Sequence, residues 1–374
     1  MSWSPKRLDE LGSVSRGRSR HRPRDAAHLY GGPHPFIQTG DVKHAGLYIT
    51  GYTQTYTEAG LQQSKLWPAG TLCITIAANI ADTAILGIDA CFPDSVIGFI
   101  ADPNQSDTRF VKYLFDATIK VRAQQFSQGA TQDNLSQEKL LSLDFDVPPV
   151  ADQTRIADIL SSYDDLIENN RRRMALLEES ARLLYREWFV RLRFPGYEHT
   201  PVMDGVPKGW ERKTLGESVT LNYGKALKAE IRVEGDYPVY GSSGIVGTHE
   251  KPLVQGPAIV LGRKGNVGSV YWSSKSFYPI DTVYFVSPES SSLYLFYALK
   301  NMHFISTDVA VPGLNRDFAY SRPLLHPPGT LLRSFHETVE PIHAQLDKLD
   351  ETNQKLRTAR DLLLPRLMSG ELAV

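Results

Sequence analysis

Few residues of this sequence have the types and spacing that a catalytic, nucleotide-binding or metal-binding site requires. Gly262 to Ser269 resembles a phosphate loop, but it lacks the Gly-Lys-Ser/Thr ending and leads into a strand-like run. His336 and His343 are seven residues apart, which is not the His-Glu-x-x-His spacing of a zinc site, so we expect solvated surface histidines. No Cys-x-x-Cys occurs, and neither does Asn-Pro-Pro-aromatic, the active-site motif of adenine methyltransferases. We therefore expect no catalytic residues, no metal and no cofactor.

Side chains suited to nucleic acid are better represented. Arg16 to Arg24 carries five arginines on a Ser-, Gly- and Pro-containing stretch that could follow a phosphate backbone. Tyr240 to Gly244 and Arg263 to Asn266 are predicted turns whose donors, acceptors and guanidinium could read base edges. The candidate DNA-binding residues are Arg16, Arg18, Arg20, Arg22, Gln38, Thr39, Asn79, Tyr223, Lys225, Tyr240, Ser242, Ser243, Arg263, Lys264 and Asn266. A solvated charged loop and ordinary hairpin turns remain the alternatives.

The charge balance limits how the chain can bind nucleic acid. It has 41 basic and 42 acidic residues and a net charge of −1, whereas a lone high-affinity binder usually carries a basic excess. The balance favours local basic patches, or DNA that is held jointly with partner subunits.

The length of 374 residues predicts two or three domains. The most apolar run, Thr71 to Ala90, contains Asn79, Asp82 and Asp89, so we expect no membrane span, and the N-terminal residues do not resemble a signal segment. Cys73 and Cys91 are isolated among apolar residues and are predicted to be buried thiols. Together these features predict a cytoplasmic protein.

The elements that position the candidate residues are organised around a long helix, Asp152 to about Arg191. Its apolar residues recur at steps of four and three, interrupted by Asn170, and a 3.5-residue period of this kind produces a seam for a partner helix. The same pattern returns 179 residues later, and Pro148-Pro149 returns as Pro327-Pro328, so we infer a duplicated unit. The predicted seam residues are Ile156, Leu160, Tyr163, Ile167, Leu177, Leu184, Ile342, Leu346, Leu349, Leu356 and Leu363. Chance similarity between two amphipathic helices is the alternative.

Two prolines lie in the second seam pattern. Because proline removes a helix hydrogen bond, we expect Pro341 to kink the helix or make it restart near Glu340, and Pro365 to limit its end. The regular part would then run from about Ile342 to Leu364. We expect the two helices to pack antiparallel, since a parallel pair would bring the two globular segments into collision at one end.

A globular segment precedes each helix, and the second segment echoes the first. Trp3, Leu8 and Gly17 shifted by 207 give Trp210, Leu215 and Gly224, and the offset falls to 179 at the helices, as shortened loops would produce. Strand-like runs and a helix from Thr108 to about Gln125 predict a mixed α/β fold. The predicted domains are 1–150, a first helix at 151–193, a linker at 194–209, a second domain at 210–330, and the second helix with the tail at 331–374.

Three further motifs carry a resemblance to a known family. They are Glu187 to Gly196 (EWFVRLRFPG), Val206 to Trp210 (VPKGW) and Leu363 to Leu372 (LLPRLMSGEL). With the order domain, helix, domain, helix, they resemble the specificity subunit of type I restriction-modification systems, over essentially the whole chain. The resemblance implies two target recognition domains, each reading one half of an asymmetric bipartite site in double-stranded DNA. It also implies that the helices dock two methyltransferase subunits, that restriction (translocase) subunits join the complex, and that this chain is not catalytic.

Two other classes of protein stay open. One is a structural or regulatory coiled-coil protein with two globular protein-binding ends. The other is a fused restriction-methylation enzyme, against which the missing methyltransferase motif counts. Sequence-dependent DNA binding, tested with and without a methyltransferase partner, separates the three.

Overall fold

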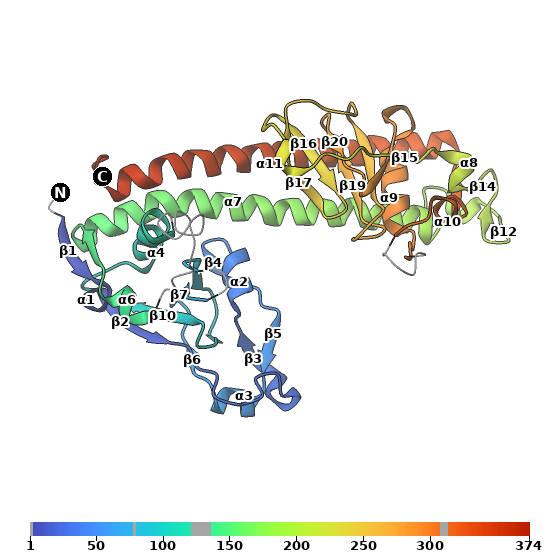
Figure 1. The fold of residues 1–374 in the computed structure, drawn as a ribbon. Coiled ribbons are helices and arrows are strands. Elements are labelled where there is room, and N and C mark those ends of the chain that lie inside the picture. Colours follow the sequence, from blue (N-terminus) through green and yellow to red (C-terminus); the bar gives the residue numbers. More distant parts are fainter. Residues whose placement is uncertain (1–2, 78–79, 121–135, 307–312) are drawn as a thin grey trace. The chain divides into compact units, whose positions relative to one another are not determined.

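The computed structural model describes residues 3–77, 80–120, 136–306 and 313–374 (Figure 1). Asn79 and residues 121–125 of the helix predicted to reach Gln125 lie outside the described residues, and the described helix that starts at Thr108 ends at Ala117. The chain divides into two compact units, which we call unit 1 (Met1–Arg172 with Glu351–Val374) and unit 2 (Arg173–Asp350). Each unit therefore contains one globular region and part of each long helix. The domain limits predicted from the sequence divide the chain differently and stay a prediction.

Unit 1 contains two sheets and a short ladder. The first sheet has the order β2 (Gly12–Arg16), β10 (Val96–Ala101), β7 (Leu72–Thr75), β8 (Thr83–Leu86), β4 (Tyr48–Ile49). The second has the order β5 (Gln54–Tyr56), β3 (Tyr30–Phe36), β9 (Ala90–Cys91), β6 (Leu66–Trp67). The ladder pairs β1 (Ser4–Arg7) with β11 (Asp144–Val147) in antiparallel register. The helices are α1 (Leu8–Leu11), η1 (Ala27–Leu29), α2 (Thr39–His44), α3 (Glu58–Gln62), α4 (Thr108–Ala117) and α6 (Gln137–Leu141).

Local sequence explains the main elements of unit 1. β7 is apolar and fully buried, and Cys73 is completely buried within it, as is Cys91 in β9, so the prediction of buried thiols is confirmed. α4 begins at the predicted residue because the Asp107 side chain accepts hydrogen bonds from the first free N–H groups of the helix. α4 packs against β8 and shares one apolar cluster with α7 (Figure 1).

Unit 2 repeats this topology. Its four-stranded sheet has the order β15 (Asn222–Tyr223), β21 (Val283–Val286), β18 (Ala258–Gly262), β19 (Val270–Ser273), which matches β2-β10-β7-β8. Its three-stranded sheet has the order β17 (Gly244–His249), β16 (Tyr237–Gly241), β20 (Tyr278–Pro279), and β16–β20 is parallel, like β3–β9. The ladder β14 (Glu211–Thr214) with β22 (Pro323–His326) matches β1–β11. The predicted duplication and mixed α/β class are confirmed.

The remaining elements of unit 2 are short. They are η3 (Tyr197–His199), β12 (Val202–Met203), β13 (Val206–Pro207), α8 (Leu215–Ser218), η4 (Ala229–Ile231), η5 (Pro288–Ser290), α9 (Leu293–Asn301) and α10 (Arg316–Tyr320). Among the described residues, no helix combines the length and the apolar character that crossing a bilayer requires.

The two long helices are α7 (Val150–Tyr185), which continues as a π-helical turn (Arg186–Val190), and α11 (Gly329–Met368). In unit 1, Asn170 binds Asn353 and Asp164 binds Arg360, so residue numbers fall along one helix as they rise along the other. In unit 2, Tyr185 of α7 packs against Phe335 of α11. The predicted antiparallel pair is confirmed. Ile156, Leu160, Ile167, Leu346 and Leu349 are buried, and Tyr163, Leu177, Leu184, Ile342, Leu356 and Leu363 are partly buried.

The two seam asparagines meet each other. The repeat aligns Asn170 with Leu349 and Asn353 with Met174, so the sequence alignment alone does not pair them. In the antiparallel helices, Asn170 Nδ2 donates to Asn353 Oδ1 over 2.9 Å, and both residues are buried. A buried amide pair of this kind fixes helix register at some cost in stability.

The expectation that the second helix would restart near Glu340 and be regular only from about Ile342 to Leu364 is wrong, whereas a kink at Pro341 stays a prediction. α11 is one helix of 40 residues that includes both Pro341 and Pro365. Each proline deprives the carbonyl four residues earlier, at Glu337 or Asp361, of its helical N–H partner. All four residues are exposed, so water can bind those carbonyl groups and the helix continues.

Candidate nucleic-acid interface

Two arginines of the first basic stretch hold that stretch together. Arg18 donates through Nε and Nη2 to the carbonyl oxygen of Ser64, and the Nε bond measures 2.8 Å. Arg22 Nη1 donates to the carbonyl oxygens of Ser19 and His21, both at 2.8 Å. These guanidinium groups satisfy buried and turn carbonyls, so part of the arginine-rich composition serves the loop's own structure.

The other three arginines of the stretch are exposed. Arg16 Nε donates to the carbonyl oxygen of Asp94, and Arg24 forms an ion pair with the Asp94 carboxylate over 2.8 Å. For Arg20, in the part of the chain that the structure describes, no side-chain hydrogen bond or ion pair is found, and only its backbone N–H binds Gln63. Arg16 and Arg20 thus present positive charge on this loop, whereas the charge of Arg24 is balanced by Asp94.

Gln38 and Thr39 lie at the start of α2 in unit 1. The Gln38 side chain donates to Gln54 of β5, and its N–H donates to Asp41 over 2.8 Å. Their contacts are thus with β5 and α2. Asn79, the remaining candidate of this unit, is outside the described residues.

The two predicted turns of unit 2 form one structure. The carbonyl oxygen of Ser242 accepts from Ser269 Oγ at 2.6 Å and from the Tyr271 hydroxyl at 3.1 Å, and Ser242 Oγ accepts from the Asn266 N–H at 3.4 Å. Ser242 is buried, as is Tyr240, whose ring packs in the core and whose pKa is raised by burial. Tyr240 and Ser242 therefore position the exposed residues Ser243, Lys264 and Asn266.

Tyr223, at the end of β15, is 47% exposed. The Arg263 guanidinium lies 4.9 Å from the centre of its ring and donates to the carbonyl oxygen of Asp281 over 3.2 Å. Arg316 lies 5.2 Å from the same ring, and no sequence pattern connects it with Tyr223 or Arg263. Lys225, two residues after Tyr223, is exposed. The fold thus brings two predicted residues, Tyr223 and Arg263, and one unpredicted arginine together.

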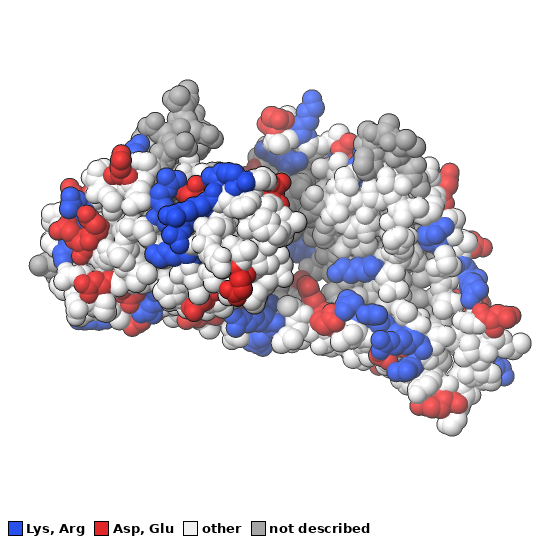
Figure 2. Space-filling model, turned by 90° about the horizontal axis from the view of Figure 1, so that it is seen from below, with Lys and Arg blue, Asp and Glu red and all other residues white. Residues whose placement is uncertain are grey.

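Positive charge on the visible surface is local. Figure 2 shows Lys and Arg side chains in separate patches, with Asp and Glu side chains between them. The arrangement agrees with a net charge of −1 and provides no continuous basic face in this view.

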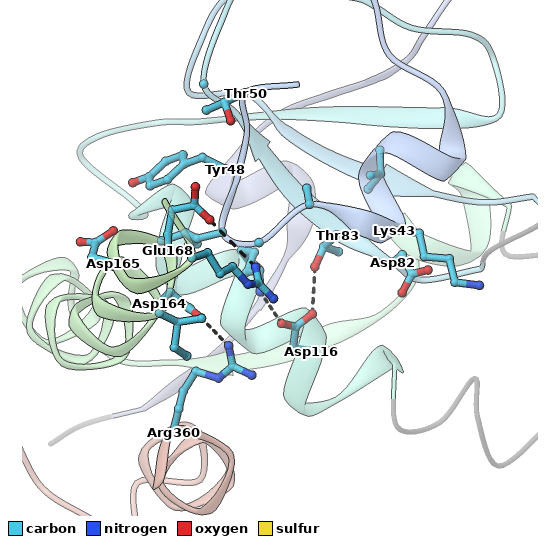
Figure 3. Close-up of a pocket in the computed structure, with 18 of the residues that line it drawn as sticks. Lys43, Tyr48, Thr50, Asp82, Thr83, Asp116, Asp164, Asp165, Glu168 and Arg360 are labelled. Atoms are coloured by element: carbon cyan, nitrogen blue, oxygen red, sulfur yellow. Dashed lines mark hydrogen bonds and ion pairs between the residues drawn. The ribbon is translucent and has the colours of Figure 1, made fainter. Parts of the chain in front are cut away.

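A cavity of about 940 Å³ lies within unit 1, between the α2–β4 connection, β8, α4, α7 and α11 (Figure 3). Its charged residues mostly neutralise one another: Asp116 pairs with Lys112 over 2.6 Å and accepts from Thr83, and Lys120 pairs with Asp82 over 2.9 Å. In the described ranges there is also no group of three His, Cys, Asp or Glu side chains that could hold a metal. These two ion pairs lie within the globular part of unit 1.

Asp164 lines the same cavity and contacts two other helices. It is 8% exposed, its Oδ2 accepts from the Tyr113 hydroxyl over 2.6 Å, and its Oδ1 accepts from Arg360, which reaches it from α11 (Figure 3). Burial and the neighbouring Asp164 carboxylate raise the pKa of Tyr113 far above its ordinary value. One carboxylate therefore joins α4, α7 and α11.

Substitution of Asp164 with Ala is expected to lower the free energy of unfolding by about 2–4 kcal/mol, because it leaves the Tyr113 hydroxyl without its partner and removes the ion pair that joins Arg360 to α7. Arg360 keeps only its pair with Asp361, its neighbour on α11. Urea unfolding of the full chain measures this loss. Asp165→Ala, at the adjacent exposed position, is the matched control and should change stability little. Equal midpoints for the two variants would contradict the assigned role.

His336 and His343 are not solvated surface residues, contrary to the sequence-based expectation. His336 Nε2 accepts from the Tyr294 N–H over 3.3 Å. His343 Nε2 lies 2.8 Å from the Tyr297 hydroxyl, and its ring lies among Trp272, Phe296 and Tyr297. Burial, together with the charge of Lys300, lowers the pKa of His343 to about 4. The seam period could not reveal this pocket, because its walls come from β19 and α9.

The buried His343 predicts a stability loss in acid. Between about pH 6.5 and pH 4 the unfolded chain binds a proton at His343 and the folded chain does not, so stability falls as pH falls through this window. Urea unfolding at pH 7, 6 and 5 should show a smaller acid loss for His343→Gln than for the wild type. His199→Gln, at an exposed position, should retain the wild-type dependence. Parallel curves for all three proteins would exclude this origin.

The comparisons with known proteins agree with this geometry. A family model described as "Type I restriction modification DNA specificity domain" matches residues 2–179 and 207–318. The chain is 24% identical over 408 aligned positions to the type I restriction enzyme MjaIX specificity subunit of Methanocaldococcus jannaschii, covering 100% of this chain and 94% of that protein. It is 22% identical over 333 positions to the HindI specificity subunit of Haemophilus influenzae, covering 66% and 72%.

Among solved structures, the S subunit of the type I restriction-modification system of M. genitalium has the same fold. The TM-score is 0.60 at 19% identity, covering 98% of this chain and 96% of that one. The names of the relatives denote the specificity component of the enzyme, not a catalytic one. Because the family model matches well over half of the residues, this chain belongs to the type I restriction-modification specificity subunits.

Proposed function

We propose that this chain reads an asymmetric, two-part site in double-stranded DNA for a type I restriction-modification complex. One observation carries the proposal: the two units have the same strand order but expose different side chains. Unit 1 presents Arg16 and Arg20, whereas unit 2 presents Ser243 and Asn266 beside stacked tyrosine and arginine. Two copies of one fold with different exposed groups suit two different half-sites.

The candidate contacts have separate roles in this proposal. Arg16 and Arg20 of unit 1, with Lys225 and Lys264 of unit 2, carry charge for phosphate groups, which position a protein on DNA. Gln38, Thr39, Ser243 and Asn266 carry the amide and hydroxyl groups that distinguish base edges. Asn79 stays a proposed contact without a structural description.

The helices are proposed to dock two methyltransferase subunits. In unit 1, Ile159 and Leu166 are exposed and seven residues apart on α7. In unit 2, Leu176, Leu183 and Val190 are exposed at two successive seven-residue steps. Exposed apolar residues at heptad spacing are suited to packing against a partner helix. Each unit has its own set of such residues, which supports one methyltransferase per unit. Restriction subunits would then join this complex in the cytoplasm, with no membrane partner.

Mapping methylated adenines in host DNA, with and without this gene, tests the proposal. We expect a methylated site of two unlike parts, separated by a gap of constant length and free sequence, that disappears with the gene. The purified complex should contain two methyltransferase copies per chain. An unchanged methylation pattern, or a single continuous palindrome, would refute the two-part reading and favour a protein-binding coiled-coil function.

A further inference from the structure

Two guanidinium groups share one tyrosine ring in unit 2. Arg263 lies 4.9 Å and Arg316 5.2 Å from the centre of the Tyr223 ring. Arg263 is also 5.7 Å from the Tyr284 ring, and Arg316 is 5.8 Å from the Tyr320 ring. We call these five residues the Tyr223 cluster.

The tyrosines of the cluster are fixed by the fold. Tyr223 and Tyr284 face each other across the β15–β21 pair, with ring centres 5.1 Å apart. The Tyr284 hydroxyl donates to the carbonyl oxygen of Leu314 over 3.0 Å, and the Tyr320 hydroxyl accepts from the Leu221 N–H over 3.0 Å. The two arginines come from different elements: Arg263 follows β18, and Arg316 is the first residue of α10. Tertiary structure therefore brings their charges together.

The charge of the cluster has no carboxylate partner among the described residues. Over the described ranges, no carboxylate forms an ion pair with Arg263 or Arg316, although the basic loop of unit 1 contains such a pair between Arg24 and Asp94. Stacking on tyrosine offsets part of the repulsion between two like charges. Arg263 and Arg316 are half-buried residues beside Tyr223, which is 47% exposed. The site is therefore suited to an external anion.

We propose that the Tyr223 cluster binds one phosphate of the DNA backbone at the second half-site, and that Arg316 is a DNA contact. This inference rests on the proposed function. A phosphate offers oxygens to both guanidinium groups at once, whereas a base edge accepts one planar fork that projects into the groove. Arg263 is held against Tyr223 and Tyr284 and does not project freely.

The assignment changes the role of Arg263. The sequence placed it among groups that could read base edges, whereas the cluster makes it a phosphate contact that sets the position of the domain. Sequence readout in unit 2 then falls to Ser243 and Asn266, which are exposed on the neighbouring turns.

The test uses the full chain in its methyltransferase complex and a duplex that contains its mapped site. Arg316→Gln and Arg263→Gln are each expected to weaken binding about tenfold at low salt. The loss should be equal for the mapped site and for duplexes with single base changes in the second half-site. The slope of log affinity against log salt should fall by about one. Lys300→Gln, which removes the cation of another cation–aromatic pair in the same unit, is the control and should change neither quantity.

A second arm identifies the phosphate. Neutral methylphosphonate is placed at one backbone position of the second half-site at a time, and one position should weaken wild-type binding at least as much as Arg316→Gln does. At that position the modification should weaken the Arg316→Gln complex less than it weakens the wild type, because only the contact with Arg263 is left to lose. Arg316→Lys, which keeps the charge, should keep the wild-type salt slope. The methylphosphonate scan also separates a DNA phosphate from a free anion. If the cluster bound a free anion, methylphosphonate would leave the affinity unchanged at every backbone position.

Several outcomes would overturn the inference. One is a glutamine variant that loses its sequence preference at a single base position while the slope of log affinity against log salt stays unchanged. That result would mean that the substituted arginine contacts a base. Another is unchanged affinity in both glutamine variants whose thermal unfolding matches the wild type. A wild-type complex with no sequence preference at all would instead refute the proposed function itself, so the two failures are distinguishable.

Discussion

Exchange of residues 210–325 for the matching segment of another specificity subunit is expected to replace the second half-site and leave the first unchanged. The segment contains every strand of the two sheets of unit 2 and all its candidate contacts. Its two ends meet in the β14–β22 ladder, where Arg212 pairs with Leu325, so a foreign segment can enter and leave the unit at one place.

Methylation mapping of cells that carry the exchanged gene measures the result. A donor segment that reads the same second half-site is the control, and it should leave the whole target unchanged. The packing of Tyr294 and Tyr297 against Tyr185 of α7 must be kept in the donor, because it attaches the globular part to the helices. A change in both half-sites would contradict the assignment of one half-site to each domain.

Removal of one heptad from each long helix should abolish methylation of the original site. Residues 171–177 directly follow Asn170, and residues 346–352 directly precede Asn353, so their joint deletion keeps the asparagine pair and the 3.5-residue seam. Each helix loses about 10 Å, or roughly three base-pair steps. We expect the gap to shorten, with weaker methylation because three steps also rotate one half-site by about a third of a turn.

Replacement of the same two heptads by unrelated heptads with the same seam residues is the control for this deletion. It changes the sequence and keeps the length, so the original gap should be retained. Methylation at the original gap after the deletion would show that helix length does not set the spacing.

Regular features of this fold could be predicted because their signal is periodic and local. The 3.5-residue seam predicts both long helices, and an amphipathic stretch predicts a helix that starts at Thr108, where α4 begins. The duplication was visible because the repeat extends beyond the helices, at Trp3 and Trp210 and at the double prolines.

The rest depends on contacts between residues that are distant in the sequence. The environment of His343 is formed by Trp272, Phe296 and Tyr297, so a reading of α11 alone placed it on the surface. The helix can continue through Pro341 because the carbonyl group that loses its partner lies at an exposed position, and the seam period does not reveal that exposure. Arg316 joins Arg263 only through the Tyr223 ring, and no spacing rule links the two arginines.

The asparagine pair also constrains how this family can change over time. Asn170 and Asn353 are 183 positions apart, but each provides the buried hydrogen-bond partner of the other. An apolar residue at one position alone would leave the other asparagine buried without a hydrogen-bond partner, whereas apolar residues at both positions would leave no unsatisfied polar group. The two codons should therefore covary among relatives, with polar residues or apolar residues at both. A change from a polar pair to an apolar pair must pass through a destabilised single mutant. The polar pair should therefore persist among relatives even while the residues of the recognition turns diverge.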